Sequence, residues 1–163
     1  MVLLGNFAAF VGCVIMVAIG FIKKKERILT AQCVQFGFLA LGNLALGATA
    51  GFISGIVGIV RNLVFTKTKG STRLKLVFIA VQLILTAFTW NGQLIEWIPV
   101  LATVLFTWFL DTKSDMLFKL VIIAGQAMWT CYDWFYLNYV AFVFDLLTIG
   151  SNLIGMLIIR KSK

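Results

Sequence analysis

Long apolar runs separated by short polar segments dominate the chain. The first, Val2–Ile22, has Asn6 as its only strongly polar residue and is long enough to cross a bilayer. The second, Ile28–Phe65, would be about 57 Å long as one helix, nearly twice the thickness of a bilayer core. It must therefore fold back on itself, and the small residues of Gly47–Gly51 permit a tight reversal.

Read along the whole chain, this pattern predicts an all-α membrane protein with seven transmembrane helices. Asn91-Gly92 ends the fourth helix, and Pro99, the single proline, falls in the fifth. The predicted helices cover residues 2–22, 28–47, 51–66, 74–90, 94–110, 116–132 and 137–159.

Composition supports this class. Of 163 residues, 61% are apolar and only 12% are charged, whereas a soluble domain has about 25% charged residues. So short a chain cannot hide this much apolar surface from water, so its solvent has to be lipid. Met1–Ile22 lacks the basic start of a secretory signal, and we expect it to remain as the first span.

The basic residues fall on alternate loops of the seven-helix arrangement. The loops after helices one, three and five, together with the C-terminus, hold 13 of the 14 lysines and arginines. The opposite loops hold none of them and carry Glu96 and Asp133. By the positive-inside rule the N-terminus is outside and the C-terminus cytoplasmic. Such clustering is typical of membrane orientation, so we expect no nucleic-acid partner.

Two Asn-Leu pairs point to an internal repeat. Asn62 lies near the end of predicted helix three and Asn152 in helix seven; Gln35 precedes the first by 27 residues and Gln126 the second by 26. An odd number of helices separates the two triplets, so they keep the same orientation, as in a parallel repeat. The resulting units are residues 1–66, a linker helix in residues 67–92, and residues 93–163.

With this 3+1+3 arrangement, the sequence resembles the MtN3-like superfamily, which includes the SWEET sugar transporters, PQ-loop proteins and PnuC-type transporters. Its size and the basic loop after helix one resemble the bacterial YgjV-type inner-membrane proteins. The resemblance implies that Asn62 and Asn152 face each other across a substrate cavity. It also implies an aromatic residue before each Asn, and Trp134 and Tyr136 fit this in the second triplet.

Two charged residues lie at membrane depth, where each costs about 2.5–3.5 kcal/mol to insert. Arg61 is close enough to the end of its helix for the guanidinium to reach the headgroups, so a merely structural interpretation stays open. Asp145 lies seven residues before Asn152 on the same helical face. We expect it to line the cavity, where it is paired with Arg61, protonated, or in contact with substrate; a structural pair is the alternative.

Chemistry other than transport finds little support in the sequence. There is no histidine, the six acids are scattered, and the three cysteines lie at unrelated spacings inside apolar runs. An enzyme needs paired acid and base groups, and a metal or haem site needs ligands, so we expect no enzyme, metal or cofactor.

The function predicted is therefore transport of a small polar solute, such as a sugar or vitamin precursor, across a bacterial inner membrane by alternating access. Asn62, Asn152, Asp145, Trp134, Tyr136 and Arg61 are the predicted substrate-binding residues. Two alternatives remain: a substrate-capturing subunit of a larger transporter, and a structural or regulatory membrane protein. The sequence leaves open the substrate, the coupling and a homo-oligomeric state.

Overall fold

The computed structural model describes residues 1–19, 25–68, 71–110 and 112–161, which form seven α-helices and one short 3-10 helix, with no strand among them. The all-helical fold and the seven predicted helices are confirmed. The elements are α1 (Val2–Ile19), α2 (Lys25–Ala45), α3 (Thr49–Lys67), α4 (Thr72–Thr89), η1 (Leu94–Glu96), α5 (Trp97–Phe109), α6 (Asp115–Phe135) and α7 (Tyr139–Lys161). Lys23, Lys24, Lys69 and Lys163 of the basic groups lie outside the described residues.

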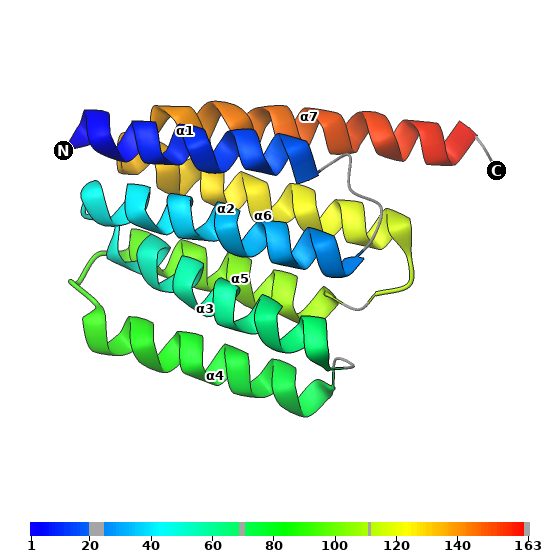
Figure 1. The fold of residues 1–163 in the computed structure, drawn as a ribbon, viewed down its shortest axis with the longest axis horizontal. Helices are drawn as coiled ribbons and strands as arrows, with labels where there is room; N and C mark the ends of the chain where they lie inside the picture. The colour runs from blue at the N-terminus through cyan, green and yellow to red at the C-terminus, as the bar shows by residue number, and fades with distance from the viewer. Residues whose placement is uncertain (20–24, 69–70, 111, 162–163) are drawn as a thin grey trace.

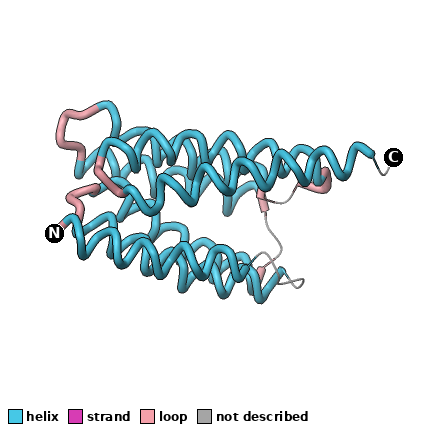
Figure 2. Tube along the Cα trace, turned by 90° about the horizontal axis from the view of Figure 1, so that it is seen from above, coloured by secondary structure: helices cyan, strands magenta, loops and turns pink. Residues whose placement is uncertain are grey.

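The helices pack as two layers of three. In one layer α1 packs against α2 and α2 against α3; in the other α5 packs against α6 and α6 against α7. The layers meet along their edges, where α1 packs against α7 and α3 against α5 (Figure 1). Figure 2 shows the two layers edge-on. Helix α4 lies outside both layers against α3 and α5, and its buried residues form one stripe: Lys75, Phe78, Gln82 and Thr86.

The two hairpins, α2–α3 and α6–α7, have closely similar turns. In the first, the N–H of Ala48 donates to the carbonyl of Asn43 at 2.8 Å; in the second, the N–H of Asn138 donates to that of Asp133 at 2.9 Å. Each turn has one residue in the left-handed region, Gly47 with φ 75° and Leu137 with φ 57°. Leucine rarely adopts this conformation, so the second turn is held by its packing rather than by local preference.

Helix α2 contacts α1 closely enough that glycine is required at one position. A Cβ built on Gly42 would lie 2.9 Å from the carbonyl oxygen of Gly5 and 3.3 Å from the backbone nitrogen of Ala9. Because these are backbone atoms, they move only if α1 itself moves. A Cβ on Gly37, in the same helix, would meet nothing within 4 Å.

These two glycines give a matched prediction. We expect Gly42→Ala to lower the free energy of unfolding by about 1–3 kcal/mol through overpacking. Gly37→Ala should raise it by about 0.5–1 kcal/mol through helix propensity. Thermal unfolding of both variants in detergent checks the signs, and destabilisation of similar size by both would contradict the packing of α1 on α2.

Apolar side chains lie on the outside of the bundle and polar side chains on the inside, as in a protein with apolar surroundings. Large apolar residues are exposed on all seven helices, among them Phe7, Leu44, Leu63, Ile84 and Leu147. Polar residues are buried instead; those inside the described part of the bundle are Gln35, Asn43, Ser54, Arg61, Asn62, Lys75, Gln82, Thr86, Glu96, Thr107, Asp133, Asn138 and Asp145. This is the reverse of a water-soluble domain and fits a bundle solvated by lipid.

Length and composition alone identify two of the described helices, α3 and α4, as long and apolar enough to cross a bilayer. Four other apolar stretches are shorter, at 10–17 residues: Val2–Ala18, Leu29–Ala45, Leu94–Phe109 and Tyr139–Ile154. The number of crossings therefore stays a prediction.

Candidate functional site

Arg61 lies inside the bundle, on the face of α3 turned toward α5. Its side chain is 2% exposed, and Nη1 donates to Oγ1 of Thr107 at 3.1 Å. Nε and Nη2 donate to Oδ1 of Asn62 at 3.2 and 3.1 Å, and the guanidinium stands 5.1 Å from the centre of the Phe106 ring. The guanidinium is thus held in the interior rather than extended to the headgroups, and it connects α3 to α5.

Asn62 continues this polar chain to α2. It is fully buried, its Oδ1 accepts from Arg61, and its Nδ2 donates to Oε1 of Gln32 at 3.0 Å. One hydrogen-bonded line, which we call the Arg61 network, therefore runs from Gln32 through Asn62 and Arg61 to Thr107. It joins three helices at the junction of the two layers.

Asn152 occupies a different environment. It is half-buried in α7, and its Nδ2 donates to the carbonyl of Thr148, one turn earlier in its own helix, at 2.8 Å. Helix α7 packs against α1 and α6, whereas α3 packs against α2, α4 and α5. Asn62 and Asn152 share no hydrogen-bond partner among the described residues, so their meeting across one cavity stays a prediction.

A second polar group lies between α6 and α7. Asp145 is 6% exposed, its Oδ1 accepts from Nε2 of Gln126 at 3.0 Å, and its carboxyl group lies within interaction distance of the Asp133 carboxyl. Asp133 is also buried and accepts from Nδ2 of Asn138 at 3.0 Å. Oδ2 of Asp145 has no hydrogen-bond donor in the described part of the chain. The sequence offers pairing with Arg61 as one role for Asp145. The described contacts of Asp145 do not include Arg61.

The sequence predicts Asp133 in a loop on the outer side and the acids scattered along the chain. The structure instead buries Asp133 and brings it to Asp145 across the α6–α7 hairpin. A signal was available, because Asp133 and Asp145 both lie within about two helical turns of one tight reversal, on neighbouring antiparallel helices. Gln126 lies seven residues before Asp133, which places both on one face of α6.

The N-terminus of α3 is capped from the other layer. No side chain caps it locally; instead Oε2 of Glu96 accepts from the N–H of Ala50 at 2.7 Å, and the Tyr132 hydroxyl accepts from the N–H of Gly51 at 2.9 Å. The hydroxyl of Tyr136 donates to the other oxygen of Glu96. Burial and this carboxylate raise the pKa of Tyr136, which lies in the turn after α6. Anionic groups at a helix N-terminus stabilise it, so Glu96 fastens α3 to the opposite layer.

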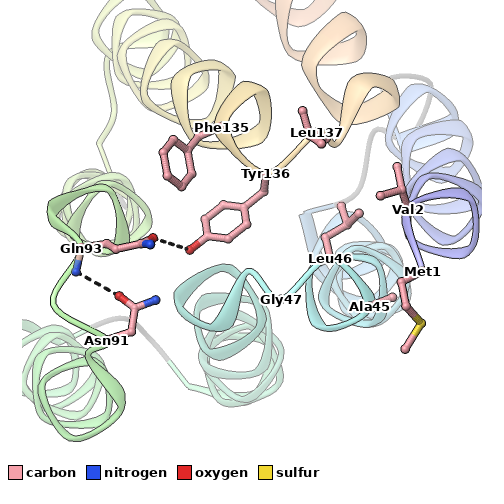
Figure 3. Close-up of a pocket in the computed structure, with 10 residues that line it drawn as sticks. All are labelled: Met1, Val2, Ala45, Leu46, Gly47, Asn91, Gln93, Phe135, Tyr136 and Leu137. Carbon is pink, nitrogen blue, oxygen red and sulfur yellow. Dashed lines mark hydrogen bonds between the residues drawn. The ribbon is translucent and has the colours of Figure 1, made fainter.

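Above this cap, at the end of the bundle that holds the N-terminus, lies a pocket of about 420 Å³. Tyr136 and Gln93 reach into it from facing sides (Figure 3), with the tyrosine hydroxyl 3.4 Å from Oε1 of Gln93. The residues lining it are Met1, Val2, Ala45, Leu46, Gly47, Asn91, Gln93, Phe135, Tyr136 and Leu137. Trp134 lies elsewhere: it is 60% exposed on the apolar surface and packs against Tyr139 and Phe142.

Metal ligands do not gather in the part of the chain that the structure describes: no group of three or more His, Cys, Asp or Glu side chains is placed to hold an ion. The Arg61 network supplies hydrogen-bond donors and acceptors around a buried positive charge.

An all-helical bundle with an apolar exterior and a polar interior is compatible with a helical membrane protein. The chain belongs to the Imp-YgjV family, described as bacterial inner membrane protein, whose model matches residues 3–163. The expected membership of the YgjV-type proteins and the expected inner-membrane location are thereby confirmed. No curated protein and no solved structure matches the chain.

Proposed function

We propose that this inner membrane protein moves a small polar solute between its two three-helix layers by alternating access. The observation that carries the proposal is the Arg61 network, a charged and fully polar chain inside a bundle whose exterior is apolar. Buried polar and ionisable groups are costly in a membrane protein and mark solute pathways. A bundle that needed only to hold together would gain as much from apolar packing.

The mechanism includes a parallel repeat of the two layers, a prediction that the helix boundaries support. Helices α2 (Lys25–Ala45) and α6 (Asp115–Phe135) have equal length and are offset by 90 residues, and α3 and α7 begin with the same offset. The offset relates Asn62 to Asn152 and Gln126 to Phe36, so the earlier pairing of Gln126 with Gln35 is one residue out of register. Transporters built from such repeats bind solute at the repeat interface.

Hydrogen bonds between the layers follow the same offset. Oε2 of Glu96 accepts from the N–H of Ala50, the second residue of α3. Oδ1 of Asn6, 90 residues before Glu96, accepts from the N–H of Val140, the second residue of α7, at 3.1 Å. In each case the start of one layer's first helix caps the last helix of the other layer. These two caps are suited to hold the outer end closed.

In this proposal residues 1–66 and 93–163 are the moving units, and residues 67–92, which contain α4, link them. Asn62 and Arg61 bind the solute from the first unit, and Asn152 and Asp145 from the second. Tyr136, which lines the pocket at the outer end, closes the path; Trp134 is placed to anchor the second unit at the interface. The N-terminus is outside and the C-terminus cytoplasmic, as the positive-inside rule predicts.

Cysteine labelling from each side of the membrane tests this proposal without knowledge of the solute. Cys13, Cys33 and Cys131 are first replaced by Ala or Ser. In this background Asn91→Cys, Thr68→Cys and Asn62→Cys are each treated with a membrane-impermeant thiol reagent in right-side-out and inverted vesicles. We expect Asn91→Cys to react from the periplasmic side, Thr68→Cys from the cytoplasmic side, and Asn62→Cys from both.

Val57→Cys is the matched control, because Val57 is buried at 4% exposure in the same helix but in an apolar environment. It should stay unreactive from either side. If Asn62→Cys is as unreactive as Val57→Cys, the interior is a packed structural core and the transport proposal fails. Reaction of Asn91→Cys and Thr68→Cys from the same side would instead overturn the orientation.

A further inference from the structure

We infer that the transported solute is an anion, and that Arg61 binds its carboxylate or phosphate group. The inference rests on the proposed transport function and names the class of solute. It starts from an imbalance of charge: Arg61 is 2% exposed, and its hydrogen-bond partners are the neutral groups of Asn62 and Thr107. The Phe106 ring adds a weak attraction and no charge.

No described carboxylate compensates this cation. Glu96 binds the N–H of Ala50 and the Tyr136 hydroxyl. Asp133 and Asp145 interact with one another and with amides of α6 and of the α6–α7 turn. A buried charge is normally paired, since desolvation costs several kcal/mol per ion. An anion that enters from outside the protein would supply the pairing.

The donors around Arg61 suit an oxyanion. A guanidinium carries five N–H groups, and three of them are used in the bonds to Asn62 and Thr107, which leaves two. The Nε2 group of Gln32, whose Oε1 accepts from Asn62, has no hydrogen bond to a described residue and adds further donors on α2. Asn62 and Thr107 fix the plane of the guanidinium, and a fixed planar fork favours bidentate binding of carboxylate or phosphate.

In the part that the structure describes, the opposite layer offers no second buried cation to an anion. The buried acidic residues described in that layer are Glu96, Asp133 and Asp145. The anionic group of the solute therefore binds at Arg61, at the α3–α5 edge, and Asp145 faces a neutral polar group of the same solute.

Thermal unfolding of the full-length protein in a neutral detergent tests the inference, with inorganic phosphate and succinate as probes at constant ionic strength. Glucose is the neutral comparison. A ligand that binds only the folded state raises Tm. We expect saturating phosphate or succinate to raise the Tm of the wild type by about 5 °C or more, on the scale of chains of this size. Glucose should have no such effect.

Three variants separate anion binding from a structural role. Arg61→Gln should lose the shift, and Arg61→Lys should keep only part of it because lysine lacks the fork. Thr107→Val removes the bond from Arg61 to α5 but leaves the charge, so it should lower Tm and still show the anion shift. Arg73→Gln, at an exposed arginine of α4, is the matched control and should behave as the wild type.

Three results would overturn the inference. The first is an absence of any shift with either anion in the wild type, and the second is an equal shift in Arg61→Gln. The third is a shift produced by phosphatidylglycerol in nanodiscs and not by free phosphate, because the anion would then be a lipid headgroup. Reactive Asn62→Cys in the vesicles together with any of these results would leave transport standing and reject only the anionic solute.

Discussion

Replacing Tyr132 by alanine is expected to lower the free energy of unfolding by about 3–5 kcal/mol, the largest effect of any single side chain considered. Tyr132 is fully buried, and its ring meets Trp129 edge-on at 5.6 Å and Tyr136 at 4.8 Å between centroids. Its hydroxyl also accepts the N–H of Gly51 at the start of α3. Truncation therefore removes a large apolar body and one end of the contact between the layers.

Tyr132→Phe separates these two contributions, because it keeps the ring and removes the hydroxyl. Its expected cost is about 1–2 kcal/mol, that of one buried N–H without a partner. Reversible unfolding in mixed micelles by sodium dodecyl sulfate measures both variants. Equal losses for the two substitutions would show that the hydroxyl, and not the ring, dominates, contrary to the burial of this residue.

The second large effect is expected at Glu96. Glu96→Ala leaves the buried N–H of Ala50 without its acceptor, removes the stronger of the two acceptors of the Tyr136 hydroxyl and takes a negative charge from the N-terminus of α3. We expect a loss of about 2–3 kcal/mol. Glu96→Gln, which keeps an acceptor oxygen and a donor in place of the charge, should lose less.

Asn6→Ala is the matched comparison, because Asn6 makes the corresponding contact to the N–H of Val140 at the outer surface. Asn6 also donates through Nδ2 to the carbonyl of Leu137 at 3.0 Å. The expected cost of Asn6→Ala is about 1–2 kcal/mol, as for two neutral and partly exposed hydrogen bonds. The same micelle titration measures all three variants. A cost for Asn6→Ala equal to or above that for Glu96→Ala would contradict the assignment of Glu96 as the main link between the layers.

The helices could be predicted from sequence because each depends on the residues of its own segment. Long apolar runs specify membrane helices, and the reversal near Gly47 was expected because glycine readily adopts a positive φ. The corresponding turn at Leu137 carries no such signal, since its left-handed residue is a leucine held by packing. The place of α4 outside the two layers could not be predicted either, because it depends on contacts between distant segments.

The sequence could indicate which polar residues lie at membrane depth, but not which residues they contact. Arg61 was expected either at the headgroups or in the interior, and the choice depends on the rotation of α3 against α5, which the sequence does not specify. Gln32 is one of several amides within apolar runs that the sequence offers as secondary candidates, whereas Thr107, which completes the Arg61 network, carries no signal that separates it from other threonines. The position of Asp133 beside a turn predicts its place along α6, but its burial depends on how α6 and α7 pack, which the sequence does not specify.

In the proposed mechanism two three-helix layers move against one another around a polar interior. Spin-label distance measurements by double electron–electron resonance, in nanodiscs with and without phosphate, test this movement most directly. Label pairs at exposed, repeat-related positions report the two ends: Leu44 with Trp134 at the outer end, and Thr30 with Leu120 at the inner end. The proposal predicts two distances for each pair, with the outer pair separating in the population where the inner pair approaches. A single distance at both ends, unchanged by phosphate, would contradict it.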